Sequence, residues 1–225
     1  MYRLHLPTGA GKTFAGGGFA LRHAALRGLR RVIVAVPFIS ITEQNAAVYR
    51  SLLDPEHGPR TVLEHHSAVN FEAPDRHAPR SLGTSGGVSQ DQRRARPNRW
   101  AKLAAENWDA PFIVTTTVRL IESLFGNSPS ATRRLHRLAN SVIVLDEVQA
   151  LPDTLLTPIL SGLRELVEHY GVTLVLSSAT QPELATLMAD RPATARHRRQ
   201  PRTAFLSFAL CGGVSVTESS QTLSR

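Results

Sequence analysis

The amino-acid sequence predicts an α/β fold in which a mostly parallel sheet carries helices on both faces. Two observations predict it. Short apolar strand candidates alternate with helical segments along the chain, and residues 32–36 form an unbroken, mostly β-branched run, Val-Ile-Val-Ala-Val. Such a run is typical of a strand that is buried on both faces. Repeated alternation of strand and helix favours parallel connections, because each helix can lie against the sheet while the chain returns for the next strand.

The expected elements follow one another in a regular order. Strands are expected at 2–6, 32–36, 61–64, 112–116, 142–145 and 172–176. Helices are expected at 12–29, 42–53 with Thr42 as its cap, around 100–106, and at 118–125 and 154–170. Together these elements place one domain over residues 1–190.

Two stretches break this pattern. Residues 71–99 are rich in Pro, Gly, Ser and Arg and exceed an ordinary connection in length, so we interpret them as a flexible insertion. Residues 191–225 form a basic tail that continues no periodic element, and we expect it to be disordered or foreign to the fold. Much of the net charge of +8 comes from this tail, so the charge is weak evidence for nucleic-acid binding.

Composition narrows the cellular setting. Cys211 is the single cysteine, which excludes an internal disulfide and favours a reducing compartment. No run approaches the roughly 18 apolar residues that a membrane span needs. We therefore expect a cytoplasmic protein without a membrane partner.

A glycine-rich stretch, Leu-Pro-Thr-Gly-Ala-Gly-Lys-Thr, occupies residues 6–13 between the first strand and the first helix. Consecutive amides can curl around a phosphate there, because a helix N-terminus offers unpaired N–H groups and a favourable dipole. Lys12 would neutralise the β- and γ-phosphates of ATP, and the Thr13 hydroxyl would ligate Mg²⁺. An ordinary glycine-rich turn is the alternative. The residues expected to bind nucleotide are Thr8, Gly9, Ala10, Gly11, Lys12 and Thr13.

An acidic pair, Asp146-Glu147, follows the strand expected at 142–145. Ligands of open parallel sheets bind beyond the carboxyl ends of the strands, which is where this pair would lie. Asp146 would hold Mg²⁺, and Glu147 would orient and deprotonate the attacking water. Standing alone, such a pair is more often a helix cap or a solvated turn.

Three further stretches have weaker signals. Ser178-Ala179-Thr180 ends a later strand, and small polar residues end many strands. Two strand-to-helix junctions offer hydroxyls, amides or a cation to a nucleic-acid backbone, with ordinary helix capping as an equally good explanation. The residues concerned are Pro37, Thr42, Gln44, Thr116, Thr117 and Arg119. Trp100 and Trp108 could stack on bases, but aromatic residues that flank a helix more often lie in the core. No second ligand cluster supports a metal site at His65-His66.

The ordered set of motifs resembles the first RecA-like domain of superfamily 2 helicases, so a RecA-like P-loop domain is expected. Leu6 replaces the glycine of the general phosphate loop, as it does in that superfamily, and Ser178-Ala179-Thr180 matches its coupling motif. The stretches at 36–45, 64–67, 106–117 and 139–152 are similar to the CRISPR-associated helicase/nuclease of type I interference systems. The likeness covers about residues 2–190.

The resemblance implies an ATP-dependent helicase of antiviral defence that translocates on single-stranded DNA after recruitment by a crRNA-guided surveillance complex. The chain departs from the family by lacking a His-Asp dipeptide and any likeness to a second RecA-like domain with its arginine finger. Such a finger can contribute roughly 10³–10⁵ in rate. We therefore expect a truncated fragment that turns over little ATP alone.

Other interpretations remain open at this point. The motifs of a first RecA-like domain contact only the backbone of nucleic acid, so they do not separate a DNA helicase from an RNA-directed one. A nucleotide-dependent binding module, or an inert remnant of a broken gene, would carry the same phosphate loop.

Overall fold

The computed structural model describes residues 1–5, 11–56, 60–68, 103–178 and 215–218. The strands are β1 Tyr2–His5, β2 Arg31–Val36, β3 Val62–His65, β4 Phe112–Thr116, β5 Ser141–Leu145, β6 Thr173–Ser178 and β7 Ser215–Glu218. They form a seven-stranded sheet in the order β3-β4-β2-β5-β6-β1-β7. Neighbours from β3 to β1 pair in parallel, while β7 pairs antiparallel with β1. The mostly parallel sheet is thus confirmed.

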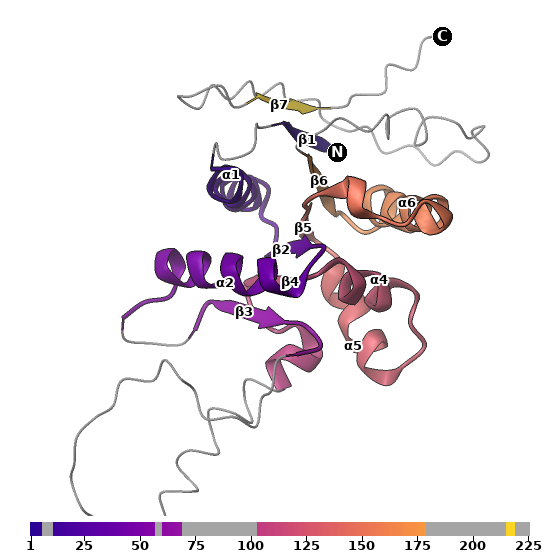
Figure 1. Cartoon of the computed structure of the whole chain (residues 1–225), viewed down its shortest axis with the longest axis horizontal. Helices are drawn as coiled ribbons and strands as arrows, with labels where there is room; N and C mark the ends of the chain where they lie inside the picture. Colours follow the sequence, from indigo (N-terminus) through magenta and orange to yellow (C-terminus); the bar gives the residue numbers. More distant parts are fainter. Residues whose placement is uncertain (6–10, 57–59, 69–102, 179–214, 219–225) are drawn as a thin grey trace, which may run out of the picture.

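Helices cover both faces of the sheet. They are α1 Lys12–Arg27, α2 Ile39–Leu53, α4 Thr117–Phe125, α5 Pro129–Leu138 and α6 Asp153–His169, with a 3₁₀ turn η1 at Val148–Ala150 and a helical segment at 103–107. One hydrophobic cluster joins α1 and α2 to the sheet, and a second joins α4, α5 and α6 to its other face. Figure 1 shows this division, with α1 and α2 on one side of the strands and the later helices on the other.

The central strand β2 explains the unbroken run of apolar residues. Val32, Val34 and Val36 belong to the cluster under α1 and α2, whereas Ile33 and Ala35 belong to the cluster under the later helices. Alternate side chains of a strand point to opposite faces, so both faces need apolar residues when both are covered. None of these five side chains is more than 3% exposed.

Helices α1 and α2 approach each other closely at Gly17. A Cβ atom on Gly17 would overlap the ring of Tyr49, so only glycine permits this contact. Tyr49 is 4% exposed and its ring packs against Phe112 with centroids 4.6 Å apart. Gly17 therefore serves helix packing, which places the first turn of α1 beside α2.

The expected start of α2 is wrong. The helix begins at Ile39 with Phe38 as its N-cap, and no side chain caps it. Thr42 lies inside the helix, where its hydroxyl donates to the Phe38 carbonyl at 3.0 Å. The β-branched residues Ile39 and Ile41 are poor helix formers, and packing on the sheet outweighs that weak preference.

Besides the short 3₁₀ turn η1, one helix and one strand were not predicted from the sequence. Helix α5 begins after Ser128, whose hydroxyl accepts from the Ala131 amide, with Pro129 in the first turn. Ser followed by Pro is an ordinary helix-start signal. Strand β7 falls within the expected tail and extends the sheet beyond β1. The insertion expected at 71–99 lies outside the described residues, and no described helix is long and apolar enough to cross a membrane.

Trp108 lies at the centre of a buried polar network, as expected of a core residue. It is fully buried, and its indole N–H donates to Nδ1 of His65 at 2.9 Å. The Arg134 guanidinium lies 5.8 Å from its ring centroid, and Arg31 donates to its carbonyl at 3.1 Å. His65 must therefore remain neutral at Nδ1 to accept the indole hydrogen.

Burial, and to a smaller extent the charges of Arg134 and Arg119 and the adjacent His66, together lower the pKa of His65 to about 3. In the unfolded chain His65 takes up a proton near pH 6.5, whereas in the folded protein it does so only near pH 3. The contribution of neutral His65 to the free energy of unfolding is therefore fully present above pH 6.5 and is lost as the pH falls toward 3. The loss from this one group is at most about 1.4 kcal/mol per pH unit.

We expect His65→Asn to flatten this acid dependence, because the amide oxygen can accept the indole hydrogen without titrating. Urea midpoints measured at intervals from pH 7 to 4 would show it. His136→Asn, at an exposed position of α5, is the control that should keep the parental slope. An unchanged slope in His65→Asn would exclude His65 as the group responsible.

Candidate nucleotide-binding site

The site is built at the edge of the sheet where the parallel strands end. Strand β6 lies between β1 and β5, so the strand ending at Ser178 separates the strand before the glycine-rich stretch from the strand before the acidic pair. Ligands of open α/β sheets bind along this edge. Three neighbouring strands therefore lead into the two predicted nucleotide motifs and the predicted coupling motif. The order of these motifs along the sequence does not by itself reveal that they are neighbours.

The glycine-rich stretch enters α1 through Gly11. Gly11 is the N-cap of α1 and has φ 74°, in the left-handed region that glycine adopts at little cost. A Cβ atom on Gly11 would meet nothing within 4 Å, so backbone conformation is what favours glycine there. Helix α1 presents its first amides at this edge. Thr8, Gly9 and Ala10 lie outside the described residues.

An ion pair joins the two nucleotide motifs. The Lys12 ammonium donates to Oε1 of Glu147 at 2.9 Å, with the two side chains only 13% and 30% exposed. Glu147 adopts φ 48°, which is uncommon for a residue with a side chain, and the Gln149 amide also donates to its carboxylate. The fold thus brings together two residues that are 135 positions apart.

Asp146 presents a half-buried carboxylate beside this pair. Its amide donates to the Ala35 carbonyl at 2.9 Å, which holds it against β2. Burial raises the pKa of Asp146, while the Ser177 hydroxyl and the Lys12 charge oppose that rise. A carboxylate held at the edge by backbone contacts, with a cation nearby, is a suitable Mg²⁺ ligand.

Helix α2 supports Thr13, a contribution that was not predicted from the sequence. The Thr13 hydroxyl donates to Asn45 at 3.3 Å, and the Tyr49 hydroxyl donates to the Thr13 carbonyl at 2.7 Å. Asn45 and Tyr49 are four residues apart and so share one face of α2. That spacing was readable, but which element the face meets depends on the tertiary fold.

The residues predicted to contact nucleic acid differ in accessibility. Thr42 is fully buried, and its hydroxyl donates to the Phe38 carbonyl. This hydroxyl is therefore not available to nucleic acid in this structure, contrary to the prediction. Thr116 is 5% exposed and caps α4 by accepting from the Arg119 amide at 3.3 Å. Thr117 is 8% exposed. Helix capping therefore accounts for the Thr116 hydroxyl in this structure.

The remaining three candidates are accessible. Gln44 is exposed, and Pro37 is partly so. Arg119 is 31% exposed in its side chain and pairs with Glu122 at 2.8 Å. A surface pair between residues three apart on a helix is weak, so phosphate can compete for this arginine.

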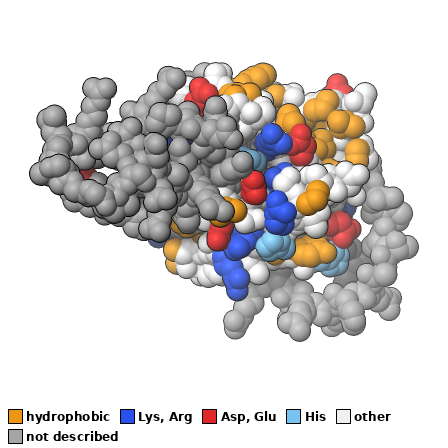
Figure 2. All heavy atoms as spheres, turned by 90° about the horizontal axis from the view of Figure 1, so that it is seen from below, with side chains coloured by type: hydrophobic (Ala, Val, Ile, Leu, Met, Phe, Trp, Pro, Cys, Tyr) orange, Lys and Arg blue, Asp and Glu red, His pale blue; other side chains and the backbone are white. Residues whose placement is uncertain are grey.

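A cavity of about 210 Å³ lies between two of the candidates, Pro37 and Thr117, and the acidic pair. Its walls include Pro37, Thr117 and Glu147, together with apolar side chains of α4 and α6. The junctions after β2 and β4 therefore lie close to Glu147. On the face shown in Figure 2, basic and acidic side chains are interspersed, so no broad basic surface appears on the described part of that face.

The predicted coupling motif is described only in part. Ser178 is the last residue of β6 and pairs with His5 of β1. Ala179 and Thr180 lie outside the described residues. Its backbone lies on the strand between β1 and β5, and the coupling role of this motif stays a prediction.

Comparison with known proteins identifies the family. The DEAD/DEAH box helicase family matches residues 2–187. The CRISPR-associated nuclease/helicase Cas3 of Haloferax volcanii is 30% identical over 193 residues, covering 80% of this chain and 19% of that protein.

Solved structures with a similar fold include T. fusca Cas3 with ADP, with a TM-score of 0.58 and 20% identity over 84% of this chain and 20% of that one. The Pyrococcus furiosus Hef helicase domain has a TM-score of 0.48 and 18% identity, covering 83% of this chain and 32% of that one. The chain spans about a fifth of the length of both Cas3 proteins. It has the RecA-like fold and belongs to the DEAD/DEAH box helicase family.

Proposed function

We propose that this chain is the ATP-binding domain of an ATP-dependent DNA helicase of CRISPR antiviral defence. The observation that carries the proposal is the ion pair between Lys12 and Glu147, which joins the glycine-rich stretch to the acidic pair across β6. The likeness to Cas3 supports the CRISPR assignment. Single-stranded DNA and a crRNA-guided surveillance complex are the partners that this assignment proposes.

In this proposal Lys12 changes partner when ATP binds. The β- and γ-phosphates attract the ammonium away from Glu147, because they carry more charge than one carboxylate. Glu147 is then free to accept a proton from the attacking water. The amides at the start of α1 bind the phosphate oxygens, and Gly11 provides the turn that directs them outward.

Asp146 and Thr13 are the residues that would hold Mg²⁺. Their chemistry fits a hard cation, since one supplies a carboxylate and the other a hydroxyl, the usual pair in P-loop proteins. When bound, Mg²⁺ neutralises charge on the transferred phosphate. Asn45 and Tyr49 fix the position of Thr13, and the Ala35 carbonyl fixes Asp146.

Lys12→Ala tests nucleotide binding directly. We expect the Kd for ATP·Mg²⁺ to rise by about 10–100-fold, because one charge-assisted contact to phosphate is removed. Lys12→Arg should also weaken binding, since the wide guanidinium does not fit a loop shaped for an ammonium. Isothermal titration with the purified chain measures both. Arg164→Ala, on the exposed side of α6, is the control that should bind like the parent.

A competition assay with the same purified protein separates a DNA helicase from an RNA-directed one. With ATP present, single-stranded DNA should displace a labelled DNA oligonucleotide better than RNA of the same sequence. RNA as the stronger competitor would favour an RNA-directed helicase. Retention of full ATP affinity in Lys12→Ala would contradict the phosphate-loop assignment itself.

A further inference from the structure

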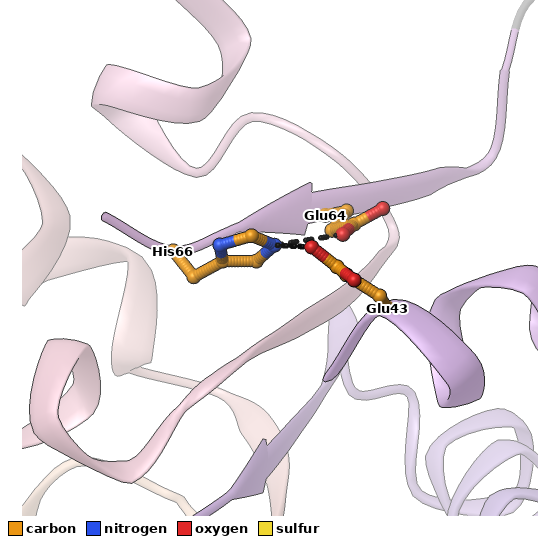
Figure 3. Close-up of side chains that lie close together, drawn as sticks. All are labelled: Glu43, Glu64 and His66. Carbon is orange, nitrogen blue, oxygen red and sulfur yellow. Dashed lines mark hydrogen bonds and ion pairs between the residues drawn. The ribbon is translucent and has the colours of Figure 1, made fainter. Parts of the chain in front are cut away.

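A second cluster of metal-ligating side chains lies at the other end of the sheet. Glu43 of α2, Glu64 of β3 and His66, just after β3, each direct a donor atom to one point, with all donor atoms within 4.8 Å of one another (Figure 3). Strand β3 is the end strand of the sheet, separated from β5 by β4 and β2. The cluster is therefore distinct from the nucleotide site.

The imidazole of His66 is the buried member of this cluster. Its side chain is 2% exposed, compared with 13% for Glu64 and 61% for Glu43. Nε2 lies 2.8 Å from Oε1 of Glu64 and 3.9 Å from Oε1 of Glu43. A nitrogen donor thus faces two carboxylates from a protected position, while the Glu43 side remains open to solvent.

The two separations from Nε2, 2.8 and 3.9 Å, lie on either side of those expected around a shared ion. Donors held about 2.1 Å from one ion lie roughly 3.0–3.4 Å apart in tetrahedral or octahedral geometry. The Glu43 carboxylate, at 3.9 Å from Nε2, is beyond hydrogen-bond reach of the imidazole, and a bridging cation would draw it inward. Only the exposed Glu43 side chain has to move appreciably, which costs little packing.

The surroundings already orient Glu64. Arg50 binds Oε2 of Glu64 at 2.8 Å, which leaves Oε1 directed at His66. An outer partner of this kind commonly fixes a ligating carboxylate. The two carboxylates and Arg50 leave one net negative charge, so a divalent cation is electrostatically favoured there.

We propose that Glu43, Glu64 and His66 bind a divalent transition-metal ion of the zinc class. An imidazole nitrogen with two carboxylates suits Zn²⁺ or Co²⁺, whereas Mg²⁺ and Ca²⁺ prefer oxygen donors alone. Three protein ligands leave at least one position for water. The proposal uses neither Asp146 nor Thr13, and it stands independently of the helicase assignment.

Metal binding requires His66 to change tautomer. Nδ1 accepts from the Ala68 amide at 3.3 Å, so the imidazole hydrogen lies on Nε2 and is donated to Glu64. Coordination through Nε2 moves that hydrogen to Nδ1, and the Ala68 amide loses its acceptor. The Ala68 amide resonance should therefore shift on metal addition, which gives a second readout.

The experiment titrates Co²⁺, as a coloured substitute for Zn²⁺, into the full chain with Mg²⁺ in excess. We expect a visible absorption band that saturates at one equivalent and disappears when Zn²⁺ is added. Glu43→Gln and His66→Ala should each weaken Co²⁺ binding by at least about 10-fold, since changing even an outer partner of a ligand commonly costs that much. His169→Ala is the matched control, because His169 and Glu165 form an exposed pair elsewhere, 3.4 Å apart.

Glu43→Gln keeps the test decisive if His66→Ala does not fold, because Glu43 is an exposed side chain whose amide variant preserves shape. A circular-dichroism melt shows whether each variant is folded. Three results would overturn the proposal: no saturable band in the parent, a band unchanged in folded Glu43→Gln, or a band lost in His169→Ala.

Discussion

Glu147→Gln is expected to slow ATP hydrolysis by about 10²–10⁴-fold, the usual contribution of a general base. The amide cannot accept a proton from water, yet it has the size and shape of the carboxylate. ATP binding should persist or tighten, because Lys12 loses the ion pair that holds it 2.9 Å from Glu147. The variant thus separates binding from turnover, which the proposed function requires.

The measurement is a single-turnover assay with protein in excess over ATP, so that a slow parental rate is still resolved. Gln149→Ala is the control: it removes a neighbour that donates to Glu147 but leaves the carboxylate, and should retain most of the rate. Hydrolysis by Glu147→Gln at the parental rate would show that another group activates the water. Loss of ATP binding would instead assign Glu147 a structural role.

Trp108→Ala is expected to destabilise the fold by about 3–5 kcal/mol, the range for truncating a large buried aromatic side chain. Trp108 is 0% exposed and fills the core between the sheet and α5. The truncation also leaves Nδ1 of His65 without its donor and Arg134 without the ring beneath it. Since total stability is commonly about 5–15 kcal/mol, this loss can unfold the domain.

Trp108→Phe separates the two causes of that loss. The phenyl ring retains much of the buried area but has no N–H, so the remaining cost reflects mainly the unpaired His65, about 1–3 kcal/mol. Leu103→Ala, at a neighbouring side chain that is 52% exposed, should change stability by less than about 0.5 kcal/mol. Guanidinium unfolding curves compare all three. A Trp108→Ala loss no larger than that of Leu103→Ala would contradict the central role of the indole.

Much of the fold could be predicted from the sequence because its strongest signals are local. The run at 32–36 is buried on both faces because both faces of β2 are covered, and the helices expected at 118–125 and 154–170 occur within a residue or so of their predicted ends. The start of α2 was misplaced because Phe38 caps the helix without a side-chain hydrogen bond, and nothing in its residue type signals that. Strand β7 depends on pairing with β1, a contact between opposite ends of the chain.

The candidate site likewise has features that could be predicted from the sequence and features that could not. The residue types of Gly11, Lys12, Asp146 and Glu147 indicated phosphate, cation and base chemistry before any contact was known. The sequence had no means of showing that β6 lies between β1 and β5, or that Asn45 and Tyr49 hold Thr13. It also left Thr42 as a candidate contact, because burial is a property of the packed helix.

The sequence by itself determined the α/β class and indicated the kind of chemistry that we propose, because both inferences follow from residue type and short-range periodicity. The tertiary structure alone decided which distant residues meet. It paired Lys12 with Glu147 and brought Glu43 of one helix to Glu64 and His66 at the end of one strand. The physical reason is that strand order and helix placement are set by burying apolar faces across the whole chain, which no short segment encodes.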